Sequence, residues 1–204
     1  MTDYLAYFKG EWIPNSEIKL DVGDRGFMVS DVVFDVERTF NGKSFRMKEH
    51  VERLYRSLKY VRIDPGLSMN EMLDLSEEVI RRNEDKRKEI GDFHISQFVT
   101  RGQGRRAWNS ESPTVCVKVA PIPFDMFAHA YSNGMHGSIT RTRSYSPEEL
   151  DPKVKSYNRM NFNLAELEAN DVDPGAWPIL RDENGNITEG SGYNVLMVTD
   201  GVIR

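Results

Sequence analysis

The spacing of apolar residues changes twice along this chain, and this change restricts the fold more than any other feature of the sequence. Apolar and aromatic residues flank short turns within 4–14 and 32–47, a pattern typical of paired strands. Within 47–61 the apolar residues recur at steps of three and four, which indicates an amphipathic helix. Strand-like runs return at 93–102 and 112–123. This order predicts an α+β domain.

Turn and capping residues mark the ends of these segments. Lys9-Gly10 and Asn41-Gly42 each lie between strand-like runs, and Asn-Gly is the strongest short-range signal for a β-hairpin. Ser68 and Glu71 have the spacing of a capping box, which predicts the start of a second helix. We therefore expect two hairpins and two helices in the first half of the chain.

A second domain is expected after a linker segment that contains Pro121 and Pro123. Residues 1–120 form the predicted first domain, 121–132 the linker between domains, and 133–204 the first part of a larger domain.

Within this second part, one helix and several strands are expected. Met160, Leu164 and Leu167 share one face of a predicted helix, with Ser156 or Asn158 as its cap. Strand-like runs follow at 177–182 and 194–198, and a turn at 200–201 opens one more strand.

Charge and hydropathy restrict the class of protein. The formal net charge of -5 argues against non-specific binding to nucleic acid. No apolar run is long enough to span a bilayer, and no positive-then-apolar leader precedes the first strand. We therefore expect a cytoplasmic protein that has neither nucleic acid nor a membrane as its partner.

Cysteine and histidine usage predicts no metal site. Cys116 is the only cysteine and lies in an apolar run, so it is interpreted as a small buried residue. The histidines at 50, 94, 129 and 136 show no metal-ligand spacing, and none is assigned a catalytic role.

Lys155 immediately precedes the predicted helix, with Tyr157 near it. It can be a surface lysine at a helix entrance, or an amine that forms an imine with a carbonyl, for which a desolvated site is needed. Spacing alone leaves both interpretations open.

Two further charged residues have a structural and a functional interpretation. Glu189 lies among glycines in TEGSGYN, where it can face water in a turn or keep the nitrogen of a pyridine ring protonated. Arg53 can lie across the edge of the core, or its planar guanidinium can bind a phosphate through two hydrogen bonds.

The Gly/Arg-rich segment TRGQGRRAW lies between two predicted strands. It lacks the strand-to-helix context of a nucleotide-binding loop. A loop with Arg105 and Arg106 beside Trp108 suits the binding of a small carboxylate.

Taken together and in order, several segments resemble the class IV (fold type IV) pyridoxal-phosphate enzymes. The resemblance runs over almost the whole chain and is carried by GDRGF, SDVVFDV, NGKSFRMKEHVERLYRS, VTRGQGRRAW, DPKVKSYN, NLAELEA and ITEGSGYNVLMVTDGVIR. That family includes branched-chain aminotransferases, D-amino acid aminotransferases, R-selective amine transaminases and aminodeoxychorismate lyases.

The resemblance implies a role for each of three residues. Lys155 would be the imine-forming lysine and the proton carrier of the reaction, Glu189 the partner of the pyridine nitrogen, and Arg53 a ligand of the cofactor phosphate. The implied cofactor is pyridoxal 5'-phosphate. The implied reaction transfers an amino group from an amino acid or amine to a 2-keto acid such as pyruvate or 2-oxoglutarate.

Three more positions bear on the substrate. Arg106 matches the arginine with which D-amino acid aminotransferases hold the substrate carboxylate. Phe34 and Trp108 stand where those enzymes have a tyrosine and a histidine, so two hydrogen-bond donors are missing and a more apolar site is expected. SDVVFDV and EGSGYNV are closer to the R-selective amine transaminases, so the donor is an amine, a D-amino acid or a branched-chain amino acid.

The resemblance also implies a small α/β domain, a larger barrel-like domain and a homodimer. Relatives continue beyond Arg204 with further strands, so we expect this sequence to be part of a longer protein whose complete form is the catalyst. Two other hypotheses are a lyase on the same scaffold, and an inactive fragment that binds a partner through unpaired strands.

Overall fold

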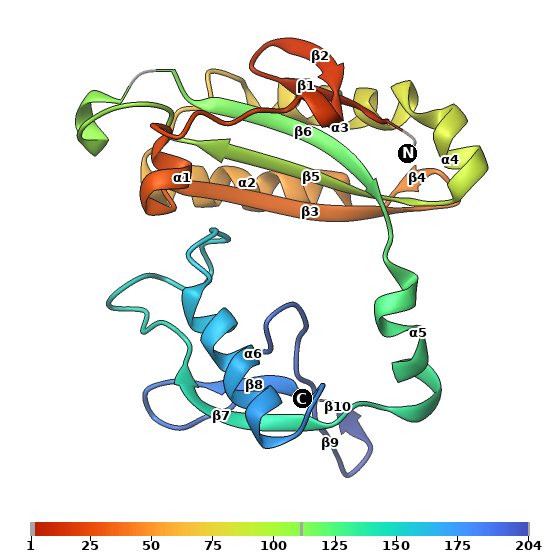
Figure 1. Ribbon diagram of the computed structural model, residues 1–204, viewed down its shortest axis with the longest axis vertical. Coiled ribbons are helices and arrows are strands. Elements are labelled where there is room, and N and C mark those ends of the chain that lie inside the picture. Colours follow the sequence, from red (N-terminus) through yellow and green to blue (C-terminus); the bar gives the residue numbers. More distant parts are fainter. Residues whose placement is uncertain (1–2, 111, 204) are drawn as a thin grey trace. The chain divides into compact units, whose positions relative to one another are not determined.

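The computed structural model describes residues 3–110 and 112–203. Its contacts divide the chain into two compact units. The first consists of residues 1–123 with 153–157, and the second of 124–152 with 158–204. Figure 1 shows the elements of each unit, and each unit is described by itself.

The first unit is built on an antiparallel sheet of six strands. The strand order is β2-β1-β6-β5-β3-β4. The strands are β1 (Leu5–Phe8), β2 (Glu11–Pro14), β3 (Val32–Phe40), β4 (Lys43–Ser44), β5 (Phe93–Thr100) and β6 (Thr114–Pro121).

Four α-helices accompany this sheet, and two of them, α2 and α3, lie behind it in Figure 1. They are α1 (Arg25–Val29), α2 (Met47–Val61), α3 (Met69–Arg82) and α4 (Glu84–Ile90), with short 3-10 helices at Asn15–Glu17 and Ala107–Asn109. Val33 and Ile95 of the sheet pack in one core with Val51 and Leu54 of α2. The apolar residues of α2 recur at the helical period and those of the strands at every second position. The apolar face of the helix therefore packs against one face of the sheet.

The expected helix and hairpin signals of this unit are confirmed. The Ser68 side chain accepts from the backbone of Glu71, and the Glu71 side chain accepts from the backbone of Ser68, which is a capping box. Asn41 and Gly42 have φ angles of +50° and +77° and join β3 to β4. Their backbone N–H groups both donate to Asp92, which holds the turn against the start of β5.

The second unit contains a parallel strand pair with a helix between the strands in sequence. It comprises α5 (Phe124–Asn133), β7 (Gly137–Arg143), α6 (Met160–Val172), β8 (Trp177–Arg181), β9 (Val198–Thr199) and β10 (Val202–Ile203). Strand β7 pairs with β8 in parallel, and β9 pairs with β10 across the predicted turn at 200–201. The strand predicted at 194–198 is wrong over most of its length, because only its last residue, Val198, belongs to β9. Leu180 of β8 packs against Phe162 and Ala165 of α6 in the core of this unit.

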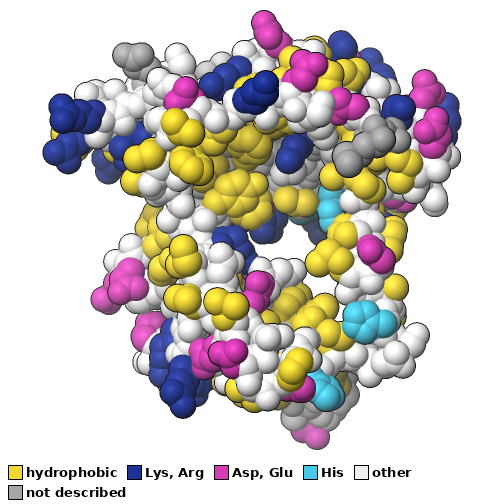
Figure 2. All heavy atoms as spheres, in the orientation of Figure 1, with side chains coloured by type: hydrophobic (Ala, Val, Ile, Leu, Met, Phe, Trp, Pro, Cys, Tyr) yellow, Lys and Arg dark blue, Asp and Glu magenta, His cyan; other side chains and the backbone are white. Residues whose placement is uncertain are grey.

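Helix α6 differs from the expectation in its cap and in its buried face. The predicted caps Ser156 and Asn158 are wrong, because the N-cap is Arg159 and no side chain caps the helix. Met160, Leu164 and Leu167 do share a face, but they are 67%, 51% and 64% exposed. The face with Phe162, Ala165 and Ala169 is buried instead. Figure 2 shows exposed hydrophobic side chains on the surface of this unit.

No helix among the described residues has both the length and the apolar character needed to cross a membrane.

Candidate functional site

Residues 155–157 extend the sheet of the first unit along the free side of β3. The N–H of Phe34 donates to the carbonyl of Lys155 at 3.0 Å, and the N–H of Tyr157 donates to the carbonyl of Val32 at 3.4 Å. Ser156 bridges to Val33 between these bonds. This pairing explains why 153–157 group with the first unit, although the sequence analysis assigned them to the second domain.

The pairing sets Lys155 opposite Phe34. The Lys155 amine lies 4.8 Å from the centre of the Phe34 ring, within the range of a cation–π contact. The Lys155 N–H also donates to the Ser57 hydroxyl at 3.1 Å, from helix α2. The lysine is half-buried, while Phe34 is buried. Two of the predicted site residues are therefore neighbours, and the backbone of Lys155 is attached to both β3 and α2.

Arg53 is oriented by a buried carboxylate on the same strand. Its Nε and Nη2 donate to the two oxygens of Asp35 at 2.7 and 2.6 Å. Asp35 is fully buried, and His50 Nδ1 lies 2.8 Å from one of its oxygens. Burial raises the pKa of Asp35, but hydrogen bonds from Arg53 and His50 and their charges hold that pKa below its ordinary value. The carboxylate therefore stays ionised and the guanidinium stays in place.

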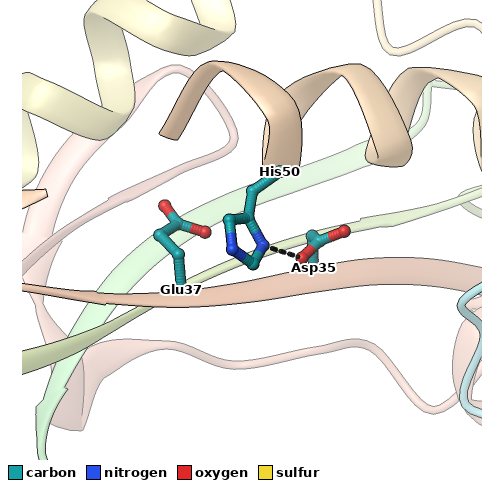
Figure 3. A group of neighbouring side chains, drawn as sticks. All are labelled: Asp35, Glu37 and His50. Atoms are coloured by element: carbon teal, nitrogen blue, oxygen red, sulfur yellow. Dashed lines mark hydrogen bonds and ion pairs between the residues drawn. The ribbon is translucent and has the colours of Figure 1, made fainter. Parts of the chain in front are cut away.

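A second buried carboxyl lies next to this group. Glu37 follows Asp35 by two residues on β3, so it points to the same side of the sheet. Figure 3 shows the His50 ring of α2 between the two carboxyl groups. Burial raises the pKa of Glu37 to about 8. Gln97 Nε2 donates to Glu37 Oε1 at 2.7 Å and to Ser76 Oγ at 2.9 Å, whereas Oε2 of Glu37 has no partner among the described residues.

Asp35, Glu37 and His50 have a spacing that could hold a metal ion, since one ligand atom from each lies within 4.8 Å of the others. Sequence spacing did not reveal this group, because the three residues come from two elements. Both oxygens of Asp35 already accept charge-assisted hydrogen bonds from Arg53. A divalent ion would have to displace this guanidinium and the proton on Glu37. The arrangement therefore suits the orientation of Arg53 better than the binding of a cation.

Arg106 and Trp108 lie together on the exposed loop after β5. The Arg106 guanidinium carbon is 5.7 Å from the Trp108 ring, and Trp108 is 82% exposed. In the described part of the chain, no hydrogen bond, ion pair or ring contact joins either side chain to Phe34 or Arg53. The loop itself is attached to helix α1, because the N–H of Arg25 donates to the carbonyl of Gly102.

Glu189 belongs to the second unit and follows β8 in a tightly shaped turn. Its carbonyl accepts from the N–H of Leu180 at 3.0 Å, and the N–H of Gly190 donates to the carbonyl of Tyr193 at 3.0 Å. A Cβ on Gly190 would lie 1.9 Å from the Tyr193 ring, so this position requires glycine. The backbone of Glu189 is thus held between β8 and the aromatic side chain of Tyr193.

Comparisons with known proteins identify the fold and the family of this chain. The crystal structure of a branched-chain amino acid aminotransferase of T.th. with pyridoxamine 5'-phosphate matches with a TM-score of 0.87 at 26% identity, over 100% of this chain and 67% of that one. The mixed helix-and-sheet fold is therefore that of the fold type IV enzymes. A sequence model of amino-transferase class IV matches residues 32–204, and the chain belongs to this family.

Two curated relatives differ in the substrate that their names give. A putative branched-chain-amino-acid aminotransferase of Methanocaldococcus jannaschii is 32% identical over 203 residues, which cover 97% of this chain and 66% of that protein. A D-alanine aminotransferase of Staphylococcus aureus is 30% identical over 201 residues, which cover 97% of this chain and 67% of that protein. The chain thus spans about two thirds of the length of the relatives that it matches.

Proposed function

We propose that this chain provides the catalytic lysine and the phosphate-binding arginine of a pyridoxal-phosphate-dependent aminotransferase. The reaction moves an amino group from an amino acid or amine to a 2-keto acid. One observation carries the proposal: the backbone N–H of Lys155 donates to Ser57, which follows Arg53 by four residues on the same face of α2. Phe34 lies against the Lys155 amine, and Asp35 orients Arg53.

The donor groups of the first unit fit a phosphate-bearing aldehyde. Among the described residues, Nη1 of Arg53 has no hydrogen-bond partner, and the Arg53 side chain is 40% exposed. A planar guanidinium with free N–H groups is suited to a phosphate dianion. The amine of the half-buried residue Lys155 is the group that would hold the aldehyde carbon.

Pyridoxal phosphate, when bound, supplies an electron sink for the bond that breaks at the substrate carbon. Lys155 would release the aldehyde to the donor amine and then, as a free amine, move a proton at the carbon that bears the amino group. The carboxylate of Glu189 would keep the ring nitrogen protonated. Arg53 would bind the phosphate, and Asp35 would keep Arg53 in place.

For the donor, we propose a branched-chain amino acid, a D-amino acid or an R-amine with an apolar side chain. Phe34 and Trp108 offer rings rather than hydroxyl or imidazole donors, and Arg106 beside Trp108 would bind the substrate carboxylate. The names of the two curated relatives support the first two donor classes. The relatives reported above are aminotransferases, so transfer is favoured over elimination of the lyase type. A homodimer and a cytoplasmic location remain predictions.

The test is turnover with a matched lysine variant. The protein encoded by the full reading frame is purified and given pyridoxal phosphate, pyruvate and one donor at a time, and alanine is measured. We expect alanine from at least one apolar donor and none from Lys155→Ala, which lacks the amine but keeps the backbone bonds of residue 155. Pyruvate release from aminodeoxychorismate without alanine formation would instead identify a lyase.

A further inference from the structure

Tyr157 lies beside the reactive lysine on the same side of the sheet. Side chains of an extended segment alternate between the two faces, and Ser156 is the residue paired with Val33. Lys155 and Tyr157 therefore both point to the face that carries Phe34. This face is opposite to the one that Val33 shares with the α2 core.

One contact orients the Tyr157 side chain. Its ring stacks on the buried Phe34, with centroids 4.2 Å apart and an angle of 29° between the planes. Burial raises the pKa of the Tyr157 phenol, and the Ser96 side chain of β5 opposes this shift only in part, so the hydroxyl stays protonated. The Tyr157 ring cannot turn aside without losing its stack on Phe34.

The distances bring this ring within reach of any molecule that reacts at the amine. The Lys155 amine is 4.8 Å from the Phe34 centroid, and the Tyr157 centroid is 4.2 Å from that same point. The amine and the Tyr157 ring are therefore at most 9.0 Å apart, the sum of these two distances. A reacting carbon lies about 3–3.5 Å from its partner atom before reaction, so a side chain of several carbons can meet the ring.

Unlike the buried Phe34, Tyr157 is partly exposed and can contact a ligand. Phe34 is 8% exposed and Tyr157 is 41% exposed. Phe34 therefore serves mainly as the support, and Tyr157 presents the ring surface that a ligand can touch.

We propose that Tyr157 is a specificity-determining residue, whose fixed ring limits the size of the donor side chain that can approach Lys155. The proposal rests on the aminotransferase function proposed above. An aromatic ring that is stacked on a buried neighbour discriminates mainly by steric exclusion, since it cannot yield without breaking the stack on Phe34.

The first test compares a small and a bulky donor in three variants. Tyr157→Ala removes the wall, Tyr157→Phe keeps the ring and loses only the hydroxyl, and Tyr131→Ala changes an 85% exposed tyrosine of α5. For Tyr157→Ala we expect the ratio of kcat/KM for a phenyl-substituted donor to that for a methyl-substituted donor to rise by about tenfold or more. For Tyr157→Phe and Tyr131→Ala we expect the ratio to stay within about threefold of the parent.

A second readout needs neither cofactor nor turnover. The protein is treated with acetaldehyde or benzaldehyde and cyanoborohydride, and alkylation of Lys155 is measured by peptide mass spectrometry relative to the exposed Lys48. We expect the benzaldehyde-to-acetaldehyde ratio at Lys155, normalised to Lys48, to be low in the parent and in Tyr157→Phe. In Tyr157→Ala this ratio should rise by about tenfold, as is expected for the ratio of kcat/KM between the two donors.

The outcomes separate the two proposals. A parent protein that makes alanine, with donor and alkylation ratios unchanged in Tyr157→Ala, overturns the role of Tyr157 and leaves the aminotransferase intact. A parent that makes no alanine contradicts the proposed function, and the alkylation ratio then decides alone whether Tyr157 limits access to Lys155. Equal effects of Tyr157→Phe and Tyr157→Ala would refute the steric argument, because the ring is still present in the first.

Discussion

Replacing Glu37 with glutamine should remove a specific pH dependence of stability. Glu37 is 4% exposed, and burial raises its pKa from the ordinary value of 4.5 to about 8. The nearby carboxylates of Asp35 and Glu77 act in the same direction, while the hydrogen bond from Gln97 and the charge of Arg53 oppose them. Between pH 4.5 and about 8, the folded protein therefore keeps a proton on Glu37 that the unfolded chain has released.

The sign and size of the effect follow from proton linkage. Because the folded state binds more protons than the unfolded state, stability is full below pH 4.5 and is lost as the pH rises towards 8. At about 1.4 kcal/mol per pH unit, the loss attributable to Glu37 is at most about 5 kcal/mol. Glutamine has a similar shape and does not titrate, so Glu37→Gln lacks this loss.

The assay is urea unfolding of the parent and of Glu37→Gln at several pH values between about 4.5 and 8. The parent should lose several kcal/mol more than the variant over this interval. Glu89→Gln, at an exposed position, serves as the control and should follow the parent. If the curves of the parent and Glu37→Gln run parallel across the interval, the carboxyl of Glu37 is ionised in the folded protein and this reasoning is wrong.

Three further predictions concern other parts of the chain. Gly190→Ala should lower the free energy of unfolding by about 1–3 kcal/mol, because the added Cβ meets the Tyr193 ring. Gly192→Ala adds a Cβ in open space and should leave this free energy nearly unchanged. Thermal unfolding of both variants measures the difference, and equal stabilities would contradict the prediction. Cys116 is fully buried, and burial raises its pKa to about 12, so iodoacetamide should label it only in denaturant, and rapid labelling of the native protein would contradict this burial. Arg53→Lys should weaken binding of pyridoxal phosphate about 10- to 100-fold and that of unphosphorylated pyridoxal far less, as measured by absorbance titration; equal losses for both would exclude a phosphate role.

The elements that the sequence predicted well are those whose signals are local. The period of α2, the capping box of Ser68 and Glu71, and the turn at Asn41-Gly42 all depend on residues a few positions apart. Such signals survive in the folded chain because tertiary packing reinforces them.

The core face of α6 could not be predicted from apolar spacing. Met160, Leu164 and Leu167 form the more apolar stripe, yet Phe162, Ala165 and Ala169 are the buried residues. Small side chains permit close approach to β8, and no property of the helix alone states which face a strand will cover.

The contacts of the candidate site link residues far apart in sequence. Lys155 meets Phe34 because Ser156 bridges to Val33, and nothing in the sequence near either residue encodes this pairing. The Asp35–Arg53 pair was missed for the same reason. His50 did carry a usable signal, since it precedes Arg53 by three residues on α2 and such residues are neighbours on a helix, although its spacing to the other histidines is not that of metal ligands.

The most direct test of the account is the covalent attachment of the cofactor. The protein is mixed with limiting pyridoxal phosphate, reduced with borohydride and digested, and the modified lysines are identified by mass spectrometry. We predict that the pyridoxyl group is found on Lys155, and that Arg53→Ala reduces this labelling at the same cofactor concentration. Labelling spread over exposed lysines such as Lys48, with none on Lys155, would contradict the claim that β3 assembles a cofactor site.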